Sequence, residues 1–392
     1  DGREEGEDKK IMVLQSVYYQ SKLGESLKKG DYLISYDNSQ GIEGEIAIQN
    51  TLYEVKSSGM PTKLPSSKYE SAMVSSLNRT DLFTTLNDTA FKTIFYGGNT
   101  QPSKDGKNKT FEDLALSDEG NSTKLAILRM DVDNLGQIFI KGFDEKVQKK
   151  SFAAYSTLSF LLEAFFSGHI NHIQQSNQHF KDYVQILYSG GDDLFAVGRW
   201  DAIIDFAAKV RSEFRRFVGR DDISISGGIA IVGAKYPIMK SAELAGNMEK
   251  AAKEFNDKAK NAINFFGETV SWGKEIDFVK GAKDSFVYFD GEVSRALIQT
   301  IQKYKLIKDE GIAQNKKDSS KPIDMSYVWH SAYSITRTLD RIDKEQGAAI
   351  SFVNSIRRNI LHNEEFGSER YLDLLALGAR WAEYILKLNK QN

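Results

Sequence analysis

The clearest alternation of apolar and polar positions lies in the middle of the chain. Leu125–Asp131 reads LAILRMD, a continuous apolar run of the length typical of a buried strand. In Ser151–Ile173 the apolar residues recur at the three- and four-residue spacing of a helix, and Trp200–Val218 repeats that spacing. Between these two helices, the runs YVQILY and LFAVG flank the sequence GGDD, which predicts a β-hairpin.

The pattern continues with a strand at Ile223–Gly233, a helix at Met239–Ala259 and a further strand near Asn261–Gly267. The resulting order, βαββαβ with additions, is that of a ferredoxin-like sheet. In this topology the first strand lies beside the third. We therefore expect Asp131, at the end of the first strand, to approach Asp192 and Asp193 at the tip of the hairpin.

The flanking regions follow different patterns. From Ile11 to about Tyr96, short apolar stretches alternate with Ser, Gly, Asn and Lys, which indicates a small, mostly β domain. Tyr96–Thr123 is rich in turn residues and is typical of a linker. From Gly291 onward the spacing is helical. We expect an α+β chain with a small β-rich domain and linker (1–123), a ferredoxin-like palm (124–290) and a helical domain (291–392).

Composition narrows the possible functions. The 392 residues carry 52 basic and 54 acidic side chains, so the chain has no overall positive charge to attract nucleic acid, and such contacts must come from local patches or partner subunits. The absence of cysteine excludes disulfides, thiol catalysis and cysteine-ligated zinc. No apolar run approaches the roughly 20 residues of a membrane span. We therefore expect no membrane association and a cytoplasmic location.

Two acidic motifs carry the candidate chemistry, DVDNLG (131–136) and GGDD (190–193). Mg²⁺ prefers oxygen ligands, and two such ions about 3.5–4 Å apart can clamp both the attacking and the leaving oxygen in phosphoryl transfer. Glycines beside the carboxylates permit positive φ angles and a close approach of a phosphate or base. The alternative is that GGDD is a polar hairpin turn and DVDN a strand end with an Asx turn.

The chain resembles the C-terminal half of the large, polymerase-cyclase subunit of type III-A CRISPR effector complexes. The phrases that carry the resemblance are LAILRMDVDNLG, YSGGDDLFAVGRWD, SISGGIAI, KYPI, EKAAKE, AINFFG and VSRAL. The similarity extends from about residue 20 to the end and is strongest from Leu125 to Leu297. It implies a GGDEF-like, cyclase-type palm that joins ATP molecules into cyclic oligoadenylates through 3′–5′ linkages and releases pyrophosphate, with residues 1–123 as an inter-palm domain.

The resemblance also implies roles for individual residues. In the family the GGDD aspartates hold divalent metal; the corresponding residues are Asp192 and Asp193, with Asp131 as the facing ligand. Asp133 is either a further ligand or a support for one. Lys253 stands where related nucleotidyl cyclases place a lysine on the triphosphate. The residues expected to bind the nucleotide are Ser189, Gly190, Gly191, Asn134 and Lys253.

The implied cofactors are two Mg²⁺ or Mn²⁺ ions, with ATP as the substrate. The implied partners are the other subunits of a type III CRISPR complex and, through that complex, guide RNA and target RNA. We expect the helical domain to dock small helical subunits. Relatives usually carry an HD nuclease domain and a first palm upstream; because none of the five histidines is followed by aspartate, we do not expect this chain to supply the nuclease.

Two other functions stay open. A cyclic dinucleotide synthase of the diguanylate type has the same palm, but its usual motif has glutamate where Asp193 stands, and the KYPI, AINFFG and VSRAL phrases argue against it. A catalytically silent scaffold of a ribonucleoprotein is the other, and the intact DVDN and GGDD motifs argue against it. The preference for adenine comes from the resemblance alone.

Overall fold

The computed structural model describes most of the chain, in twelve segments. These are residues 15–27, 30–37, 46–48, 51–56, 73–77, 92–94, 97–98, 100–117, 121, 123–141, 152–318 and 325–389. The chain divides into two compact units, one of residues 1–101, 139–181 and 185–193, and one of residues 102–138, 182–184 and 194–392. Within the described segments, no helix combines the length and apolar character required to cross a membrane.

The N-terminal part of the first unit contains a helix and a small sheet. Its described elements are α1 (Gln15–Leu27), β1 (Tyr32–Asp37), β2 (Ala47–Ile48), β3 (Thr51–Lys56), β4 (Met73–Leu77) and β5 (Lys92–Ile94). The strand order is β2-β3-β1-β4-β5, and β1 pairs antiparallel with both of its neighbours. Ile34, Leu52 and Val74 form a small apolar cluster. The β-rich character matches the expectation, whereas the pattern did not predict α1.

The helix predicted over Ser151–Ile173 has three parts. They are α4 (Phe152–Glu163), a π-helical segment η1 (Ala164–His169) and α5 (Ile170–Gln174), followed by α6 (Gln178–Tyr183). The π-helical segment is buried from Ala164 to Gly168. Single π-helical turns are rare in proteins, and those that occur are often found at functional sites.

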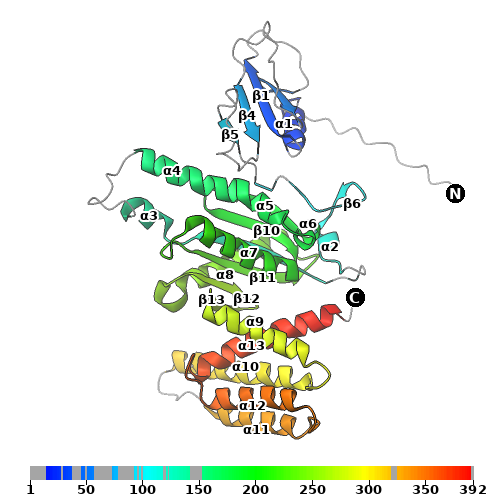
Figure 1. The fold of residues 1–392 in the computed structure, drawn as a ribbon, viewed down its shortest axis with the longest axis vertical. Helices are drawn as coiled ribbons and strands as arrows, with labels where there is room; N and C mark the ends of the chain where they lie inside the picture. The colour runs from blue at the N-terminus through cyan, green and yellow to red at the C-terminus, as the bar shows by residue number, and fades with distance from the viewer. Residues whose placement is uncertain are drawn as a thin grey trace, which may run out of the picture. The chain divides into compact units, whose positions relative to one another are not determined.

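The palm sheet has six strands in the order β13-β12-β11-β8-β10-β9 (Figure 1). The strands are β8 (Lys124–Val132), β9 (Val184–Gly190), β10 (Asp193–Arg199), β11 (Ile225–Gly233), β12 (Ala262–Phe265) and β13 (Glu268–Ser271). The first palm strand, β8, lies between β11 and the third palm strand, β10. This order confirms the ferredoxin-like prediction, and β12 and β13 extend the sheet on the β11 side.

Two long helices, α7 (Trp200–Val218) and α8 (Ile238–Lys258), contact β8 and β11. The amphipathic pattern predicted α7 with the bounds that it has, and the helix ends at Gly219, whose φ is 64°. Helix α8 packs closely on β11 at Gly228. A Cβ atom at this position would lie 2.2 Å from the backbone nitrogen of Glu249, so the packing requires glycine here. This close approach brings the polar face of α8 over the end of β8.

The predicted linker contains ordered structure. Residues 103–108 form the hairpin of β6 (Ser103–Lys104) and β7 (Lys107–Asn108), and α2 (Phe111–Leu114) follows. A capping box between Thr110 and Asp113 starts α2. Leu114 and Ala115 are fully buried and pack with β8 residues. Leu114 and Ala115 therefore belong to the apolar core around β8, although the turn-rich composition of the segment does not indicate this packing.

The part of the chain after the sheet is helical where the structure describes it (Figure 1). The described helices are α9 (Lys274–Tyr288), α10 (Ala296–Lys317), α11 (Ser326–Leu339), α12 (Gly347–Leu361) and α13 (Ser368–Asn389). Ala282 and Phe286 of α9 belong to the same apolar cluster as the buried residues of α10 to α13. The packing of this cluster thus begins before Gly291, and the three domain limits given by the sequence stay predictions.

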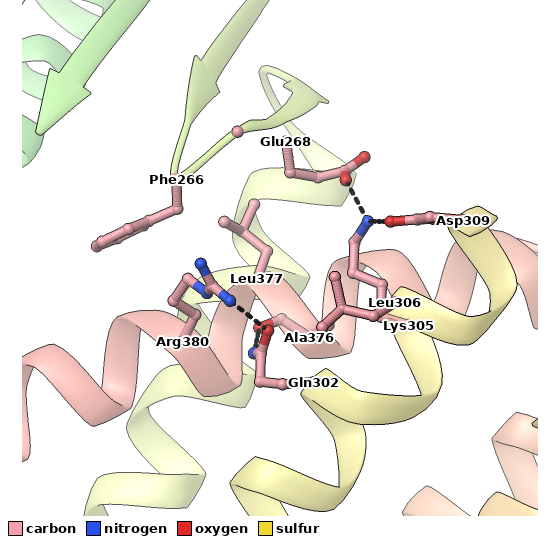
Figure 2. A pocket seen from close by; sticks show the side chains of 10 residues that line it. Phe266, Glu268, Gln302, Lys305, Leu306, Asp309, Ala376, Leu377 and Arg380 are labelled. Carbon is pink, nitrogen blue, oxygen red and sulfur yellow. Dashed lines mark hydrogen bonds and ion pairs between the residues drawn. The ribbon is translucent and has the colours of Figure 1, made fainter. Parts of the chain in front are cut away.

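A network of ion pairs joins the palm edge to these helices. Lys305 of α10 binds Glu268 of β13 at 3.1 Å and Asp309 at 2.6 Å, beside a cavity of about 200 Å³ (Figure 2). Arg370 of α13 donates to Glu275 at 2.7 and 3.0 Å and to Glu268 at 2.9 Å. Each of these charges is paired with an opposite charge, so the network serves to hold the helices to the sheet.

Candidate functional site

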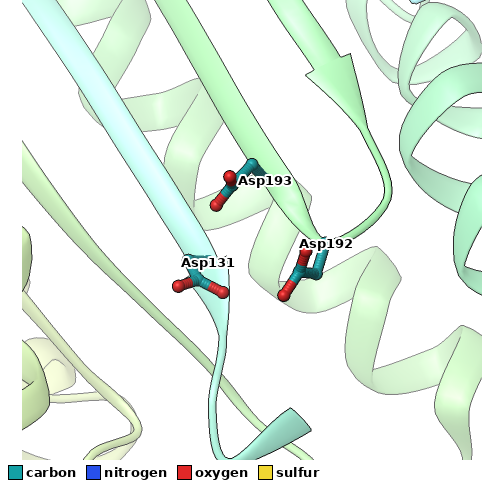
Figure 3. Close-up of side chains that lie close together, drawn as sticks. All are labelled: Asp131, Asp192 and Asp193. Carbon is teal, nitrogen blue, oxygen red and sulfur yellow. The ribbon is translucent and has the colours of Figure 1, made fainter. Parts of the chain in front are cut away.

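Asp131, Asp192 and Asp193 point toward one another where β8 ends and β10 begins (Figure 3). One carboxylate oxygen from each residue lies within 4.8 Å of the other two. Asp193 is the first residue of β10, the neighbour of β8, and Asp192 lies in the turn before it. The strand order predicts this approach.

The two oxygens of Asp131 have different surroundings. The side chains of β8 alternate between the two faces of the sheet, which puts Arg129 and Asp131 on the α8 face. Asp131 Oδ2 forms an ion pair with Nζ of Lys253. Asp131 Oδ1 is buried and accepts no hydrogen bond from the residues that the structure describes. A buried acceptor without a partner costs about 1–3 kcal/mol, so a bound ligand at this oxygen would be stabilising.

Lys253 lies between two carboxylates. Its Nζ also forms an ion pair with Glu249 Oε1 at 3.1 Å, and Glu249 Oε2 forms a second ion pair with Nε of Arg129 at 3.2 Å. Burial alone would lower the pKa of Lys253, but the hydrogen bonds and charges of Asp131 and Glu249 outweigh it and raise the pKa. Lys253 is therefore positively charged at neutral pH and partly neutralises the acidic cluster.

The donor set fits a hard divalent cation. It consists of carboxylate oxygens, the ligands that Mg²⁺ and Mn²⁺ prefer, and it includes the orphaned Oδ1 of Asp131. Across the residues that the structure describes, this is the group of acidic or histidine side chains with the spacing of a metal site. Asp131, Asp192 and Asp193 would hold such an ion.

The two glycines of GGDD have different surroundings. Gly191 has a φ of 63°, a left-handed conformation that favours glycine, and its N–H donates to Glu163 Oε2 at 3.0 Å. A Cβ atom at Gly190 would lie 3.2 Å from Oγ of Ser167. The turn is therefore shaped by its contacts with the π-helical segment.

Ser189 is buried, and its hydroxyl is engaged within the protein. Ser189 Oγ donates to the carbonyl of Phe166, and the carbonyl of Ser189 lies 3.2 Å from Oγ of Ser167. These contacts give Ser189 a structural role in the fold. The expected roles of Ser189, Gly190 and Gly191 in nucleotide binding stay predictions.

Asp133 lies outside the group of three and is 1% exposed. Its Oδ2 accepts hydrogen bonds from Ser224 Oγ at 2.6 Å, Ser226 Oγ at 3.0 Å and the N–H of Asn261 at 3.0 Å. Asp133 thus ties the end of β8 to β11 and to the approach to β12, as a support does. Its alternative role as a metal ligand stays a prediction.

Asn134 follows in a left-handed conformation, with a φ of 57°. Its Oδ1 accepts from Nζ of Lys260 at 2.6 Å. Lys260 belongs to a run of non-glycine residues with positive φ after the kink in α8. The expected contact of Asn134 with a nucleotide stays a prediction.

Two acidic residues of this region, Glu163 and Glu249, are absent from the sequence prediction. Glu249 stands four residues before Lys253 on one helix, a spacing from which their ion pair is readable. Glu163 meets Gly191 across 28 residues of sequence. No local sequence pattern predicts that contact.

Comparison with known proteins agrees with the resemblance. Residues 124–264 match the family described as Cas10/Cmr2, second palm domain. The chain is 34% identical over 189 residues to the CRISPR system single-strand-specific deoxyribonuclease Cas10/Csm1 (subtype III-A) of Mycobacterium tuberculosis, which covers 44% of this chain and 23% of that protein. The protein of the same name from Streptococcus thermophilus is 30% identical over 239 residues, 59% of this chain and 29% of that protein.

Solved structures show the same fold. The crystal structure of a Csm1-Csm4 cassette in complex with pppApA superimposes with a TM-score of 0.59 at 15% identity, over 94% of this chain and 50% of that chain. The cassette in complex with cA4 gives a TM-score of 0.53 at 18% identity, over 79% and 43%. The expected similarity to the C-terminal half of the type III-A large subunit is confirmed, and the chain spans less than a third of the length of these curated relatives.

Proposed function

We propose that this chain carries the nucleotidyl-transfer centre of a type III CRISPR RNA-guided effector complex and converts ATP into cyclic oligoadenylates. The observation that carries the proposal is the convergence of Asp131, Asp192 and Asp193 with an orphaned oxygen on Asp131. The similar cassettes were solved in complex with ATP, pppApA, cA3 and cA4, which supports an adenine nucleotide as the substrate.

In the proposed reaction, the 3′-hydroxyl oxygen of one ATP attacks the α-phosphorus of another. The new O–P bond forms as the bond between the α-phosphorus and its bridging oxygen to the β-phosphate breaks, pyrophosphate leaves, and the hydroxyl proton passes to solvent. Closure of the ring repeats the step within one chain of adenylates. When bound, divalent ions supply charge neutralisation and alignment of the phosphates.

The protein's own groups position and neutralise charge. The three aspartates would hold the ions at the junction of β8 and β10. Lys253 is charged and pairs with Asp131 and with Glu249, the latter at 3.1 Å; in the proposed reaction it exchanges its ion pair with Asp131 for one with the triphosphate. Such a lysine binds phosphate as a compact point charge.

The partners that we propose are the other subunits of the complex, with guide RNA and target RNA reached through them. The cassettes that match contain Csm4 beside Csm1, which supports assembly with other subunits. The matched relatives are named deoxyribonucleases, but the match covers 21–29% of their length. The three aspartates support nucleotidyl transfer, and we do not assign the nuclease activity to this chain.

The test is product analysis after incubation of the chain, alone and with its partner subunits and target RNA, with each nucleoside triphosphate and Mg²⁺ or Mn²⁺. We expect pyrophosphate and cyclic oligoadenylates from ATP, identified by mass spectrometry. Cyclic dinucleotides from GTP would instead support the diguanylate-type alternative. No product under any of these conditions would support the silent scaffold.

A further inference from the structure

The GGDD turn is fastened to the π-helical segment by a carboxylate with no assigned role. Glu163 is the last residue of α4 and directly precedes that segment. Its Oε2 accepts from the N–H of Gly191 at 3.0 Å, and its Oε1 accepts from Oγ of Ser167 at 2.6 Å. One side chain thus bridges a residue of the turn and a residue of the helix.

Two further contacts reinforce this attachment. Ser189 Oγ, one residue before the glycines, donates to the carbonyl of Phe166 in the π-helical segment. The carbonyl of Ser189 in turn lies within 3.2 Å of the hydroxyl of Ser167. The strand end, the turn and the widened helical turn form one hydrogen-bonded unit, and Glu163 is its charged member.

The hydrogen bond to Gly191 matters because glycine has more backbone conformational freedom than any other residue type. Gly191 adopts a φ of 63°, and glycine populates both signs of φ with similar ease. A carboxylate that accepts a backbone N–H makes a charge-assisted bond, roughly twice as strong as a neutral one. That bond selects one conformation of the turn, and Asp192 is the next residue.

We propose that Glu163 is a positioning residue that sets the conformation of the Gly190–Gly191 turn and thereby the placement of Asp192 for a divalent cation. The inference rests on the proposed function for its purpose, but its test does not require turnover. Glu163 is outside the group of metal-compatible carboxylates. It acts through the turn and not as a ligand.

The experiment measures Mn²⁺ affinity by electron paramagnetic resonance on the full chain without nucleotide. Residues that orient metal ligands typically change metal affinity by about 10–100-fold, so we expect Glu163→Ala to weaken Mn²⁺ binding about tenfold. In Glu163→Gln the amide oxygen can accept from Gly191 and the amide nitrogen can donate to Ser167, whose proton can turn to Ser189. We expect this variant to lose about threefold or less, the difference between a charged and a neutral hydrogen bond.

The matched control is Glu310→Gln, the same chemical change at an exposed position within α10, which should leave Mn²⁺ binding unchanged. Ser167→Ala removes one arm of the bridge and keeps the carboxylate, and it should weaken Mn²⁺ binding less than Glu163→Ala does. If Glu163→Ala proves unstable, the comparison of Glu163→Gln with Ser167→Ala still decides the proposal.

Two outcomes would overturn the inference. Wild-type Mn²⁺ affinity in Glu163→Ala would remove any positioning role. Equal losses in Glu163→Gln and Glu163→Ala would show that the negative charge, and not the bond to the turn, matters. Failure of the proposed function is separate: a wild-type chain that makes no product from ATP while these metal affinities differ as expected would defeat the reaction and retain the positioning role.

Discussion

Asp131, Asp192 and Asp193 converge on one another, whereas Glu268 and Glu275 converge on the guanidinium of Arg370. In the second cluster the acids are matched by cations, since Lys305 and Lys308 add further pairs with Glu268 and Asp373. In the first, Lys253 contributes one ammonium, and Asp131 retains a buried oxygen without a hydrogen bond. Both clusters are partly buried and built from the same residue types.

The difference lies in what completes each cluster. A partly buried charge is tolerated when its neighbours balance it, so the Arg370 network is complete in the folded protein. Three carboxylates with oxygens within 4.8 Å of one another repel, and a divalent cation bound between them would offset that repulsion. The Arg370 network therefore serves stability, and the aspartate cluster is suited to binding. Four changes test this contrast.

The largest effect is expected for Asp192→Ala with Asp193→Ala. Loss of two carboxylates removes the anchors for metal-bound phosphate, and we expect product formation from ATP to fall at least about a thousandfold. The melting temperature in metal-free buffer should stay near that of the wild type or rise, because a repulsion is removed. Oligoadenylate synthesis at a comparable rate, or an unfolded variant, would contradict the assignment.

Arg370→Met should act on stability. Glu268 and Glu275 would keep their burial and lose their shared cation, and breaking such a pair from one side costs about 3 kcal/mol of unfolding free energy. Urea denaturation measures the loss. Arg358→Met, at an exposed position on α12, is the control. If the double variant Arg370→Met with Glu275→Gln recovers none of the lost unfolding free energy, the imbalance of charge is not the cause of the destabilisation.

Lys253→Met should separate metal binding from turnover. The ammonium competes with a cation for Asp131, so we expect Mn²⁺ affinity in nucleotide-free protein to rise. Product formation from ATP should fall about tenfold, as expected when one charged hydrogen bond to phosphate is lost. Lys250→Met, exposed on the same helix, is the control. A fall in Mn²⁺ affinity would contradict the competition.

The smallest effect concerns pH. Burial alone would raise the pKa of Glu275, but the hydrogen bonds and charge of Arg370, together with the hydrogen bonds from Ser271, outweigh it and lower the pKa below its usual 4.5. A lowered carboxyl pKa adds stability above about pH 4.5 that is lost as the pH falls through the folded-state value. Unfolding free energy of the wild type should therefore drop more between pH 6 and about pH 3.5 than that of Glu275→Gln, by less than about 1 kcal/mol. If the unfolding free energies of the two proteins fall in parallel with pH, the Glu275 carboxylate makes no pH-dependent contribution to stability.

The sequence predicted the elements with strong periodicity. Helix α7 combines an amphipathic pattern with a terminal glycine, and its bounds match the prediction. The π-helical segment was invisible because Phe165, Phe166 and Ile170 continue an apolar run that fits an α-helix equally well. The pattern also missed β13, which pairs with β12 across a tight turn in which Phe266 has a positive φ.

The site was predicted as far as motif and topology determine it. Asp131 and the GGDD aspartates could be brought together because strand order in a βαββαβ sheet is fixed by handedness and pairing. The bond from Gly191 to Glu163 depends on how a helix rotates over the hairpin, which no spacing encodes. Similarly, the three donors to Asp133 are Ser226 of β11, Ser224 directly before that strand and Asn261 directly before β12, and no local spacing predicts that they meet.

The π-helical segment makes chain length a constraint at this point in the molecule. Deleting one residue between Glu163 and His169 would let the helix close into regular α turns, and every position before the deletion would rotate by about 100°. The carboxylate of Glu163 would then leave the hairpin without any substitution at the site. Insertions and deletions in this stretch should accordingly be tolerated less than most point changes, and sequences aligned here by apolar spacing alone are offset by one residue.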